Sequence, residues 1–508
     1  MATTTTTSSA VDTPPAAAAS SAIGSLKSEL DNNGVRTLRI AFVGNVDSGK
    51  SSLIGTLIRG ELDDGRGLSR QAIFRHKHEV DSGRTSSIAT AYMGFDAQGE
   101  QVVAKRSGKI LPWSELAKHS HKKIQLIDLA GHERYLKTTV FGLTGMQPDI
   151  VVVVVGANMG VKKMTLEHLG ITMSLEIPVV IALTKIDIAP KPVARDTLQT
   201  IRKCLRQYGK MGMLVKSLDE AVNAAKGLPS NRLTPILPLS NVTGDGLDNL
   251  RHLLHCVDVE ALVRSAQSFS NQDNDHTNLG TLSDKSLSAW TPPHGLSVEM
   301  PIDDTYQVPG AGFVIAGTIV TGTIKTNDVV KIGPDHNGHF HKVVVRSIES
   351  MYIPLKEVVT GQTTALGIRS LNKKQVLNRG NFRKGMVLVN LATDEKPFVS
   401  RRFEAKVMIL HHQTTITVGY QPMVNCRTIR QTAAITAILG TDENVEQRTI
   451  RTGDRAVIEF TFLHYAEFVK PGMRFVFRDG QAKGIGQVTR VLLPDKDDLR
   501  HNNQLDSS

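Results

Sequence analysis

Residues 39–53, RIAFVGNVDSGKSSL, constrain the fold more than any other part of the sequence. An apolar run predicts a buried strand, Gly44 and Gly49 bracket a turn, and the residues that follow begin a helix. In such a unit, loop N–H groups and the helix N-terminus converge on phosphate oxygens, Lys50 adds a charge and Ser51 offers a hydroxyl to Mg²⁺. We therefore expect a nucleoside triphosphate to bind at Gly44, Asn45, Val46, Asp47, Ser48, Gly49, Lys50, Ser51 and Ser52.

The pattern of apolar runs changes along the chain. Between Leu38 and about Val263, the runs LRIAFVG, KIQLIDLAG, DIVVVVVGA, PVVIALTKID and TPILPLS alternate with amphipathic stretches, which is typical of a mostly parallel sheet flanked by helices. Later runs such as GFVIAGTIVTGTI, HKVVVRSIESM and RAVIEFTF are short and separated by turn residues, which predicts antiparallel barrels. The fold class is therefore an α/β nucleotide-binding domain followed by two β-barrels.

These changes also set the expected domain boundaries. We expect residues 96–121 to extend the strand that precedes LIDLAG, and 190–233 to form a helical insertion that contains Lys and Arg. The expected divisions are a disordered Thr/Ser/Ala/Pro-rich tail at 1–33, the α/β domain at 34–265, a polar linker or flexible loop at 266–296, barrels at 297–395 and 396–495, and a polar tail at 496–508.

The net charge and the cysteines indicate which kind of partner and which cellular compartment to expect. The net charge of +11 over 508 residues favours a polyanionic partner, nucleic acid above all, although a merely solvated basic surface is the alternative. Three separated cysteines suggest a reducing compartment, and no apolar run is long enough to span a membrane. We expect a cytoplasmic monomer; a plastid transit peptide is the competing interpretation of the hydroxyl-rich N-terminus.

The segment LIDLAGHERY predicts the catalytic end of the site. Asp128 ends a strand, where its carboxylate can reach Mg²⁺ through a water, and the N–H of Gly131 can approach a γ-phosphate. His132 follows directly and is the candidate catalytic residue. Because catalysis of phosphoryl transfer is chiefly positioning, we expect His132 to orient the attacking water rather than to deprotonate it.

Two further strand ends predict the choice of base. In VIALTKID, the carboxylate of Asp187 can accept the N1–H and N2–H hydrogens of guanine, whereas adenine offers no such pair of donors, so GTP is preferred to ATP. Lys185 can lay its aliphatic stem along the base. The predicted guanine-binding residues are Thr184, Lys185 and Asp187, together with Ser240, Asn241 and Val242 of PLSNVTGDG, where a backbone N–H can meet the guanine carbonyl oxygen.

Between the phosphate loop and DLAGH lies GRTSSIAT, a Gly/Ser/Thr-rich stretch suited to a transition between order and disorder. We expect Ser87 to place its hydroxyl on Mg²⁺ when the γ-phosphate is present. Ser86 is the neighbouring alternative. The expected metal ligands are therefore Ser51, Ser87 and, through water, Asp128.

With these segments in this order, the chain resembles the translational GTPases of the elongation factor Tu and elongation factor 1-alpha type over about residues 37–495. The phrases DSGRTSSIATAYMGFD, FGLTGMQPDIVVVVVGANMG, LHHQTTITVGYQPMVNCRTIRQTAAI and VFRDGQAKGIGQVTRVL most resemble the GTP-binding protein 1 and GTP-binding protein 2 family. The resemblance implies GTP hydrolysis and a role in ribosome-linked surveillance, aminoacyl-tRNA handling or mRNA turnover.

Carried over by position, the resemblance makes Lys50 the phosphate lysine, Ser51 and Ser87 the magnesium hydroxyls, and His132 the histidine that the ribosome aligns; Asp47 is similar to the family's loop aspartate. The sequence departs from elongation factor Tu at Ser48, Ser86, Ala130, Thr184 and Ala311, while Arg427, Thr428 and Thr432 align with its RTxxxT pattern. Thr184 lacks the donor and acceptor pair of the usual asparagine, which weakens guanine contact on that side. Ser86 stands where elongation factor Tu has an isoleucine that forms part of a hydrophobic gate beside the nucleotide. With a polar residue at this position, only Val46 remains as an apolar wall of such a gate.

Three functions share this architecture. The first is a GTP-hydrolysing switch that binds GTP or GDP with Mg²⁺ and acts on a ribosome, tRNA or mRNA. The second is a GTP-regulated adaptor for RNA-decay or other protein partners, without turnover stimulated by ribosomes. The third, the GTPase subunit of a sulfate-activating complex, lacks support from the phrases quoted above.

Overall fold

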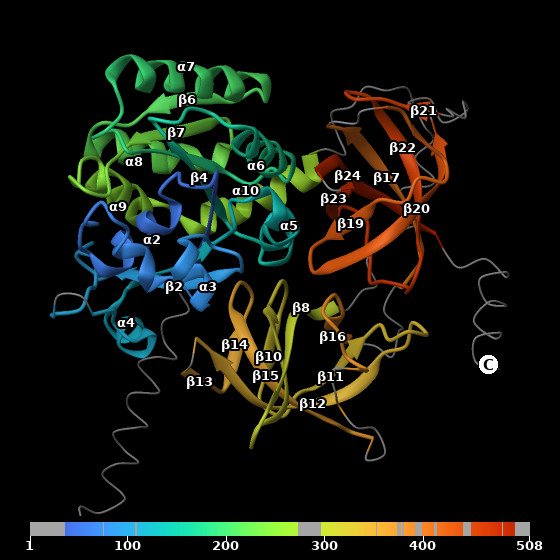
Figure 1. The fold of residues 1–508 in the computed structure, drawn as a ribbon. Helices are drawn as coiled ribbons and strands as arrows, with labels where there is room; N and C mark the ends of the chain where they lie inside the picture. The colour runs from blue at the N-terminus through green and yellow to red at the C-terminus, as the bar shows by residue number, and fades with distance from the viewer. Residues whose placement is uncertain are drawn as a thin grey trace, which may run out of the picture. The chain divides into compact units, whose positions relative to one another are not determined.

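The computed structural model describes residues 36–74, 76–106, 109–272, 296–351, 353–372, 377, 380–391, 399–410, 414–439, 449–479 and 481–492 (Figure 1). The expected tails at 1–33 and 496–508 lie outside the described residues, as does most of the expected linker at 266–296. Within the described part, the helix α10 (Val259–Gln272) continues past residue 266 and the strand β8 begins at Leu296.

A seven-stranded sheet forms the centre of the first part of the chain, in the order β2-β3-β1-β4-β5-β7-β6. Its strands are β1 (Leu38–Gly44), β2 (Ala89–Phe95), β3 (Lys122–Asp128), β4 (Ile150–Gly156), β5 (Val179–Thr184), β6 (Met211–Leu214) and β7 (Leu233–Pro238). Only β2 runs antiparallel to its neighbour, β3; the other pairings are parallel. The prediction of a mostly parallel sheet is therefore confirmed.

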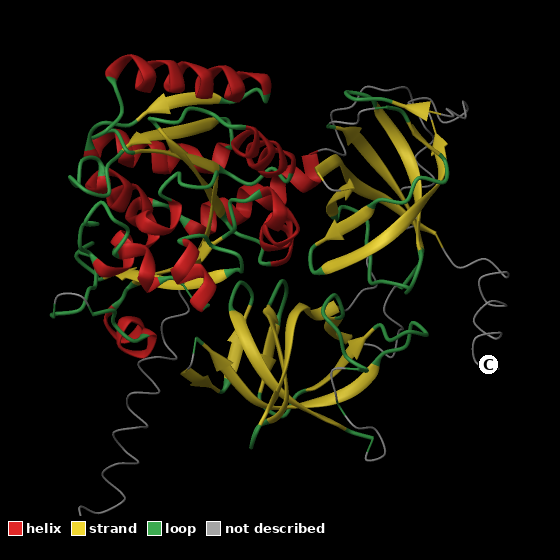
Figure 2. Cartoon of the chain, in the orientation of Figure 1, coloured by secondary structure: helices red, strands yellow, loops and turns green. Residues whose placement is uncertain are grey.

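Helices cover both faces of this sheet (Figure 2). Along β4, Val152 and Val154 join one buried cluster and Val151 and Val153 join another, because successive side chains of a strand point to opposite faces. The helices are α2 (Lys50–Arg59), α3 (Lys77–Ser82), α4 (Trp113–His119), α5 (Leu136–Gly145), α6 (Lys163–Ser174), α7 (Lys191–Gln207), α8 (Leu218–Gly227), α9 (Leu247–Cys256) and α10, with short 3₁₀ turns η1 (Ser69–Ala72), η2 (Glu133–Tyr135) and η3 (Leu228–Ser230).

Two sequence expectations in this part were wrong. Residues 96–121 do not extend the strand before LIDLAG: β3 begins at Lys122, and 113–119 form α4, whose Trp113 packs against Tyr92. Residues 190–233 are not only helical, because between α7 and α8 the strand β6 pairs with β7 and completes the edge of the sheet (Figure 1). Because β6 is half-exposed and four residues long, it carries little of the apolar pattern that marks a strand.

The rest of the described chain is antiparallel β-structure. The strands β8 (Leu296–Val308), β9 (Gly312–Thr318), β11 (Val329–Gly333), β12 (His341–Ser350), β13 (Ile353–Leu355), β15 (Thr363–Ser370) and β16 (Val387–Leu391) form one sheet, with β10 (Thr323–Lys325) and β14 (Glu357–Val359) paired beside it. The strand β11 pairs with both β12 and β16, so the sheet closes on itself.

The last strands form a closed barrel in the order β17-β22-β20-β19-β23-β24. They are β17 (Arg402–Ile409), β19 (Met423–Cys426), β20 (Ile429–Leu439), β22 (Arg455–Phe462), β23 (Arg474–Asp479) and β24 (Gln481–Leu492), with the short pair β18 (Ile416–Thr417) and β21 (Thr449–Ile450). The predicted fold class is confirmed. Among the described residues, no helix is both long and apolar enough to cross a membrane.

Candidate nucleotide-binding site

The predicted phosphate loop connects β1 to α2. Gly49 precedes the helix with φ +83°, a conformation that an L side chain adopts only with strain, and Asp47 also has a positive φ of 61°. Leu53 donates its backbone N–H to the carbonyl oxygen of Gly49 at 2.8 Å, which starts the helix directly after the loop. The loop therefore has the strand, turn and helix N-terminus that bind phosphate.

Three polar side chains meet beside this loop. The ammonium group of Lys50, 6% exposed, is ion-paired with the fully buried carboxylate of Asp128. The hydroxyl of Ser51 donates to the other carboxylate oxygen of Asp128 at 2.8 Å. The structure thus brings together the predicted phosphate lysine, the hydroxyl at the start of α2 and the aspartate of DLAG. The ion pair satisfies two charges that would be costly to bury alone.

Gly131 packs against the phosphate loop. A Cβ atom built there would lie 2.6 Å from the carbonyl oxygen of Gly44 and 3.0 Å from the carbonyl carbon of Asn45, so no larger residue fits. The hydroxyl of Thr139, on α5, donates to the carbonyl oxygen of Ala130 at 2.7 Å and fixes the DLAG turn from the other side. The DLAG turn and the phosphate loop consequently form one packed unit.

His132 lies next to this unit and is half-buried. Its Nδ1 accepts the backbone N–H of Arg134 at 3.1 Å, which caps η2. In the neutral ring this acceptor role leaves the proton on Nε2, which is then a hydrogen-bond donor. A donating Nε2 can orient a water molecule by its oxygen, and it is not available as a base.

The base-recognition segments are tied to the phosphate loop by side chains. Thr184, at the end of β5 and fully buried, donates its hydroxyl to the carbonyl oxygens of Ser48 at 2.5 Å and Val155 at 3.2 Å. Asn241 donates its Nδ2 to the carbonyl oxygen of Gly49 at 3.3 Å. Sequence reasoning placed Thr184 and Asn241 beside guanine; the structure shows that both brace the loop.

The remaining predicted guanine residues differ in exposure. Ser240 is fully buried, and its Oγ accepts the backbone N–H groups of Val242 at 3.2 Å and Thr243 at 3.1 Å. Lys185 is half-buried with a φ of 60°, while Asp187 is exposed just beyond the end of β5. Thr184 is buried and bound to the phosphate loop, whereas the carboxylate of Asp187 is exposed and can contact a base.

The segment between the phosphate loop and DLAGH brings a different hydroxyl to the site from the one we expected. Thr85 donates its hydroxyl to Asp128 Oδ2 at 2.9 Å, and its Oγ1 lies 2.9 Å from Ser51 Oγ. Ser87 instead donates its hydroxyl to Glu79 Oε1 at 3.1 Å. Sequence reasoning did not single out Thr85 or Glu79. The only signal was the run Thr85–Ser86–Ser87, in which spacing does not show which hydroxyl faces inward.

These oxygens suit a magnesium ion. Mg²⁺ prefers hard oxygen ligands and takes few of them from the protein, and the hydroxyl of Ser51 and the carboxylate of Asp128 offer such oxygens beside the phosphate loop. Burial, together with the nearby charge of Lys50, lowers the pKa of His168, on α6, to about 3. His168 is therefore neutral and adds no positive charge to that of Lys50.

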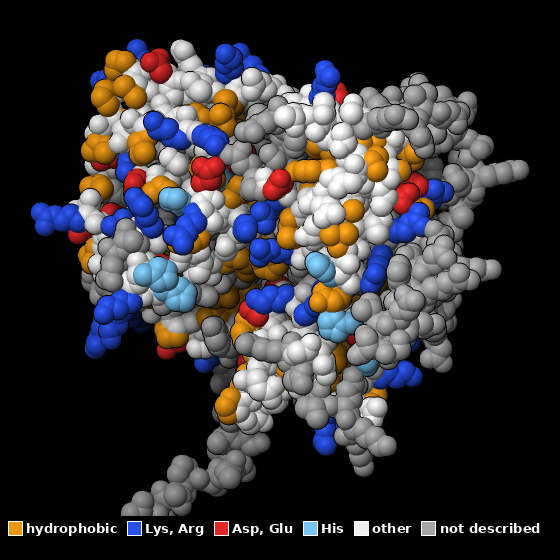
Figure 3. All heavy atoms as spheres, turned by 45° about the vertical axis from the view of Figure 1, so that its right-hand side comes forward, with side chains coloured by type: hydrophobic (Ala, Val, Ile, Leu, Met, Phe, Trp, Pro, Cys, Tyr) orange, Lys and Arg blue, Asp and Glu red, His pale blue; other side chains and the backbone are white. Residues whose placement is uncertain are grey.

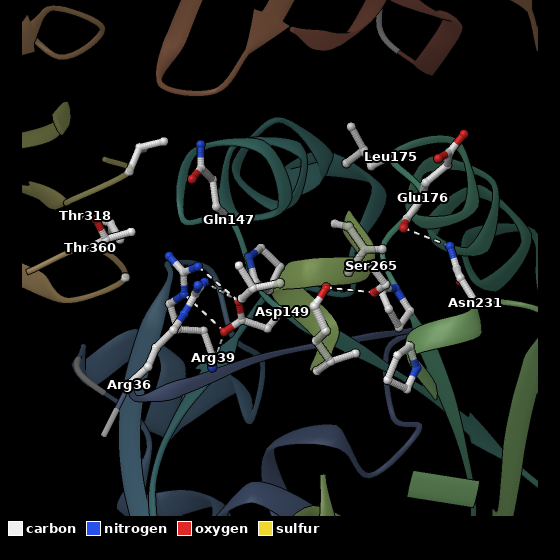
Figure 4. Close-up of a pocket in the computed structure, with 18 of the residues that line it drawn as sticks. Arg36, Arg39, Gln147, Asp149, Leu175, Glu176, Asn231, Ser265, Thr318 and Thr360 are labelled. Atoms are coloured by element: carbon white, nitrogen blue, oxygen red, sulfur yellow. Dashed lines mark hydrogen bonds and ion pairs between the residues drawn. The ribbon is translucent and has the colours of Figure 1, made fainter. Parts of the chain in front are cut away.

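A cavity of about 350 Å³ lies away from these residues (Figure 4). Asp149 projects into it and is ion-paired with Arg36 at 2.9 Å and Arg39 at 3.1 Å. Asp149 also accepts the backbone N–H of Arg39 at 2.8 Å, so its carboxylate is bound from several sides. None of the predicted nucleotide-site residues lines this cavity, and the ion pairs join the start of β1 to the residue that precedes β4.

The α/β domain and each of the two β-rich parts that follow it match a known protein family. The family descriptions that match are the elongation factor Tu GTP binding domain at residues 35–262, elongation factor Tu domain 2 at 312–381 and the elongation factor Tu C-terminal domain at 397–492.

Among solved structures, the chain is similar to the bacterial selenocysteine-specific elongation factor EF-Sec, with a TM-score of 0.56 and 20% identity over 92% of this chain and 61% of that one. It is also similar to elongation factor SelB from Methanococcus maripaludis in complex with the GTP analogue GppNHp, with a TM-score of 0.56 and 18% identity over 91% of this chain and 80% of that one. At these identities the likeness supports the fold.

Curated relatives are closer in sequence. The chain is 41% identical to GTP-binding protein 1 of Xenopus laevis over 471 residues, and 37% identical to human GTP-binding protein 2 over 464 residues. These matches cover 92% and 91% of this chain, and the chain spans 65% and 70% of the two relatives' lengths. Elongation factor 1-alpha of Hyperthermus butylicus is 26% identical over 490 residues, which cover 98% of that protein. The chain belongs to the GTP-binding protein 1 and GTP-binding protein 2 family of elongation factor Tu-like GTPases.

Proposed function

We propose that this chain is a GTP-hydrolysing molecular switch that acts on ribosome-bound translation complexes. One observation carries the proposal: a hydroxyl of the segment between the phosphate loop and DLAGH, that of Thr85, contacts both Ser51 and Asp128. A segment that contacts the phosphate end of the site can be held by the γ-phosphate of GTP and released after hydrolysis. The packed unit of the loop and Gly131 would transmit that change to His132.

Each residue then has a role in binding or hydrolysis. The loop N–H groups and Lys50 would hold the β- and γ-phosphates, and the N–H of Gly131 would face the γ-phosphate. Ser51, a hydroxyl from residues 85–87 and Asp128 would hold Mg²⁺, which supplies neutralising charge to the phosphates. The Nε2–H of His132 would orient the attacking water, which fits the contact of its Nδ1 with Arg134.

Guanine would be recognised chiefly through Asp187. Because Thr184 and Asn241 brace the phosphate loop, the exposed carboxylate of Asp187 is left to accept the N1–H and N2–H hydrogens of the base. Lys185 would cover one face of the base with its aliphatic stem. Recognition of the base and shape of the loop are therefore coupled through β5.

An RNA-containing partner is supported by charge and by the likeness to elongation factor 1-alpha along its length. Lys and Arg side chains are scattered over the face shown in Figure 3 rather than gathered in one stripe, so this face shows no single basic groove for RNA. Of the residues in the RTxxxT pattern, Arg427 is ion-paired with Glu299 through its guanidinium, and Thr428 is buried.

The decisive experiment measures GTP turnover by the full chain with and without ribosomes. We expect ribosomes to stimulate turnover, and in co-sedimentation we expect more of the chain to bind them with a non-hydrolysable GTP analogue than with GDP. Absence of stimulation by ribosomes and by RNA would refute the ribosome-linked role and leave the adaptor hypothesis.

A salt titration provides a second measurement. If phosphate contacts supply the affinity for RNA, the logarithm of the affinity should fall linearly with the logarithm of the salt concentration, with a slope of about −0.7 to −0.9 per contact. A flat dependence would show that the basic surface is merely solvated. The measurement separates those two interpretations of the net charge without relying on turnover.

A further inference from the structure

The loop 60–68, which connects α2 to η1, contacts the last of the predicted guanine-binding segments. The backbone N–H of Asp63 donates to the carbonyl oxygen of Asn241 at 2.8 Å. Beside this bond, a Cβ atom built on Gly244 would lie 3.3 Å from Cδ2 of Leu62. Asp63 and Asn241 are each 8% exposed, so their hydrogen bond is shielded from water. Two segments that are far apart in the sequence therefore meet at the base-recognition end of the site.

The carboxylate of Asp63 keeps the loop in the conformation that makes this contact. Its Oδ1 accepts the backbone N–H of Ser69 at 2.8 Å, in a buried hydrogen bond. Ser69 in turn lies directly on α2, because a Cβ atom built on Gly55 would be 2.1 Å from the Ser69 carbonyl oxygen. Buried polar groups are almost always paired, and this pairing fixes the loop against the helix that begins at the phosphate loop.

In the guanine-binding segment, the peptide group between Asn241 and Val242 is held at both ends. Its carbonyl oxygen accepts from Asp63, and its N–H, which belongs to Val242, donates to Oγ of Ser240 at 3.2 Å. The side chain of Asn241 also reaches the phosphate loop, where Nδ2 donates to the carbonyl oxygen of Gly49 at 3.3 Å. Asn241 is therefore oriented from the loop 60–68, from its own segment and from the phosphate loop.

This arrangement leaves one backbone donor of the segment available to a base. Along residues 240–244, the other backbone N–H groups donate to Ser240 or to Asp245. Among the described residues, the backbone N–H of Asn241 has no acceptor. It is therefore the donor that can meet O6 of guanine, a carbonyl oxygen. Because Asp63 fixes the neighbouring peptide group, the direction of this donor depends on Asp63.

We propose that Asp63 is a positioning residue for guanine, which holds Asn241 through its backbone N–H and the loop 60–68 through its carboxylate, so that the N–H of Asn241 faces O6 of the base. The inference deepens the proposed function and rests on it. Asp187 would contact the N1–H and N2–H hydrogens of guanine, so O6 and these hydrogens would be recognised by different parts of the site. The loop after α2 thereby becomes a determinant of base choice.

The first experiment compares Asp63→Ala with Asp63→Asn in the full chain. Alanine removes the acceptor for the Ser69 N–H, whereas asparagine keeps a carbonyl oxygen at that place. Equilibrium titration measures the dissociation constants of three nucleotides. GDP is the reference; inosine diphosphate keeps O6 and lacks the 2-amino group; 6-thioguanosine diphosphate keeps the N1–H and N2–H donors and carries sulfur, a weaker acceptor, at position 6. Asp196→Ala, which removes an exposed carboxylate from α7, is the matched control.

We expect Asp63→Ala to weaken the binding of GDP and of inosine diphosphate by the same factor, about five- to tenfold, because both nucleotides lose one hydrogen bond at O6. Binding of 6-thioguanosine diphosphate should weaken by about twofold or less, since its sulfur gains little from the Asn241 donor. Asp63→Asn should stay within about twofold of the wild-type chain for all three nucleotides, because the acceptor for Ser69 is retained.

Three outcomes of this comparison would overturn the inference. Equal weakening of all three nucleotides by Asp63→Ala would show that Asp63 supports the domain in general rather than the donor to O6. Unchanged GDP affinity in Asp63→Ala would show that the loop does not position the segment, and equal losses in Asp63→Ala and Asp63→Asn would exclude the acceptor as the cause. If the wild-type chain bound GDP no more tightly than ADP, guanine recognition and the proposed function would fail, which is a distinguishable result.

The second experiment uses the wild-type chain, so it decides the question even if Asp63→Ala fails to fold. Hydrogen–deuterium exchange is followed at saturating GDP and at saturating 6-thioguanosine diphosphate. Because coupling between two sites is reciprocal, we expect GDP to slow exchange in residues 61–68 together with 240–246, and to slow it more than the thio analogue does. Slower exchange in 240–246 with unchanged exchange in 61–68 would overturn the inference, and so would equal protection of 61–68 by the two nucleotides.

Discussion

The hydroxyl of Thr184 donates a hydrogen bond to the backbone carbonyl oxygen of Ser48 at 2.5 Å, and thereby joins the base-recognition strand β5 to the phosphate loop. Thr184 stands where elongation factor Tu has an asparagine. Its short side chain faces the loop, so the absence of an amide group at this position does not leave the loop without a brace.

Removing this brace should weaken nucleotide binding. Thr184→Ala leaves the carbonyl oxygen of Ser48 without this donor, a loss of about 1–3 kcal/mol when the group is buried. We expect GDP to dissociate about tenfold faster, measured with a fluorescent analogue by stopped flow. Thr184→Ser, which keeps the hydroxyl, should behave like the wild-type chain; equal effects of the two changes would instead implicate the methyl group.

Replacing His132 should affect hydrolysis and spare binding. His132→Ala removes the Nε2–H donor that would orient water, so we expect GTP turnover to fall about 100-fold or more while the dissociation constant for GTP stays within a few-fold. Single-turnover hydrolysis and equilibrium titration measure the two effects separately. A parallel loss of affinity would indicate that the histidine serves the structure of η2, which its Nδ1 caps. His121→Ala, an exposed histidine, is the control.

Asp187 should determine the choice of base. In Asp187→Asn the amide can donate to the C2 carbonyl oxygen of xanthine but no longer accepts both guanine hydrogens. We expect GTP affinity to fall roughly 100-fold, because two charge-assisted hydrogen bonds weaken, and affinity for xanthosine triphosphate to rise. Competition binding with GTP, ATP and xanthosine triphosphate is the measurement. Equal loss of affinity for all three nucleotides would contradict base recognition by this residue.

His168 should make the α/β domain sensitive to acid. Burial, with a contribution from the charge of Lys50, lowers the pKa of His168 in the folded chain from the ordinary value of 6.5 to about 3. Between pH 6.5 and pH 3 the ring is therefore neutral in the folded chain and protonated in the unfolded chain. The stability that the neutral ring provides is complete above pH 6.5 and is lost as the pH falls toward 3, by about 1.4 kcal/mol per pH unit. Thermal unfolding between pH 5 and 8 measures this loss.

The matched variant for this prediction is His168→Leu. Neither ring nitrogen of His168 has a hydrogen-bond partner among the described residues, so an apolar side chain of similar size sacrifices no polar contact. We expect the variant to unfold at a temperature that depends less on pH between 5 and 6.5 than that of the wild-type chain. An identical pH dependence of the two chains would show that other groups cause the loss.

Several features of the fold and the site were readable from the sequence because their signals are local. The apolar run Ile150–Val155 predicted a strand buried on both faces, and β4 has that burial throughout. The edge strand β6 and the helix α4 were missed, because short, half-exposed elements carry weak periodicity and depend on the neighbours they pack against.

By itself, the sequence determined the phosphate loop, the fold class of an α/β domain followed by β-barrels, and the segments in which the candidate site residues lie. It could do so because glycine positions and side-chain periodicity specify backbone conformation locally. Tertiary structure alone decided what particular side chains do. It turned Thr184 and Asn241 toward the loop and Thr85 toward Asp128. Adjacent side chains point in different directions, so sequence spacing does not show which of the hydroxyls of Thr85 and Ser87 contacts Asp128 and which contacts Glu79.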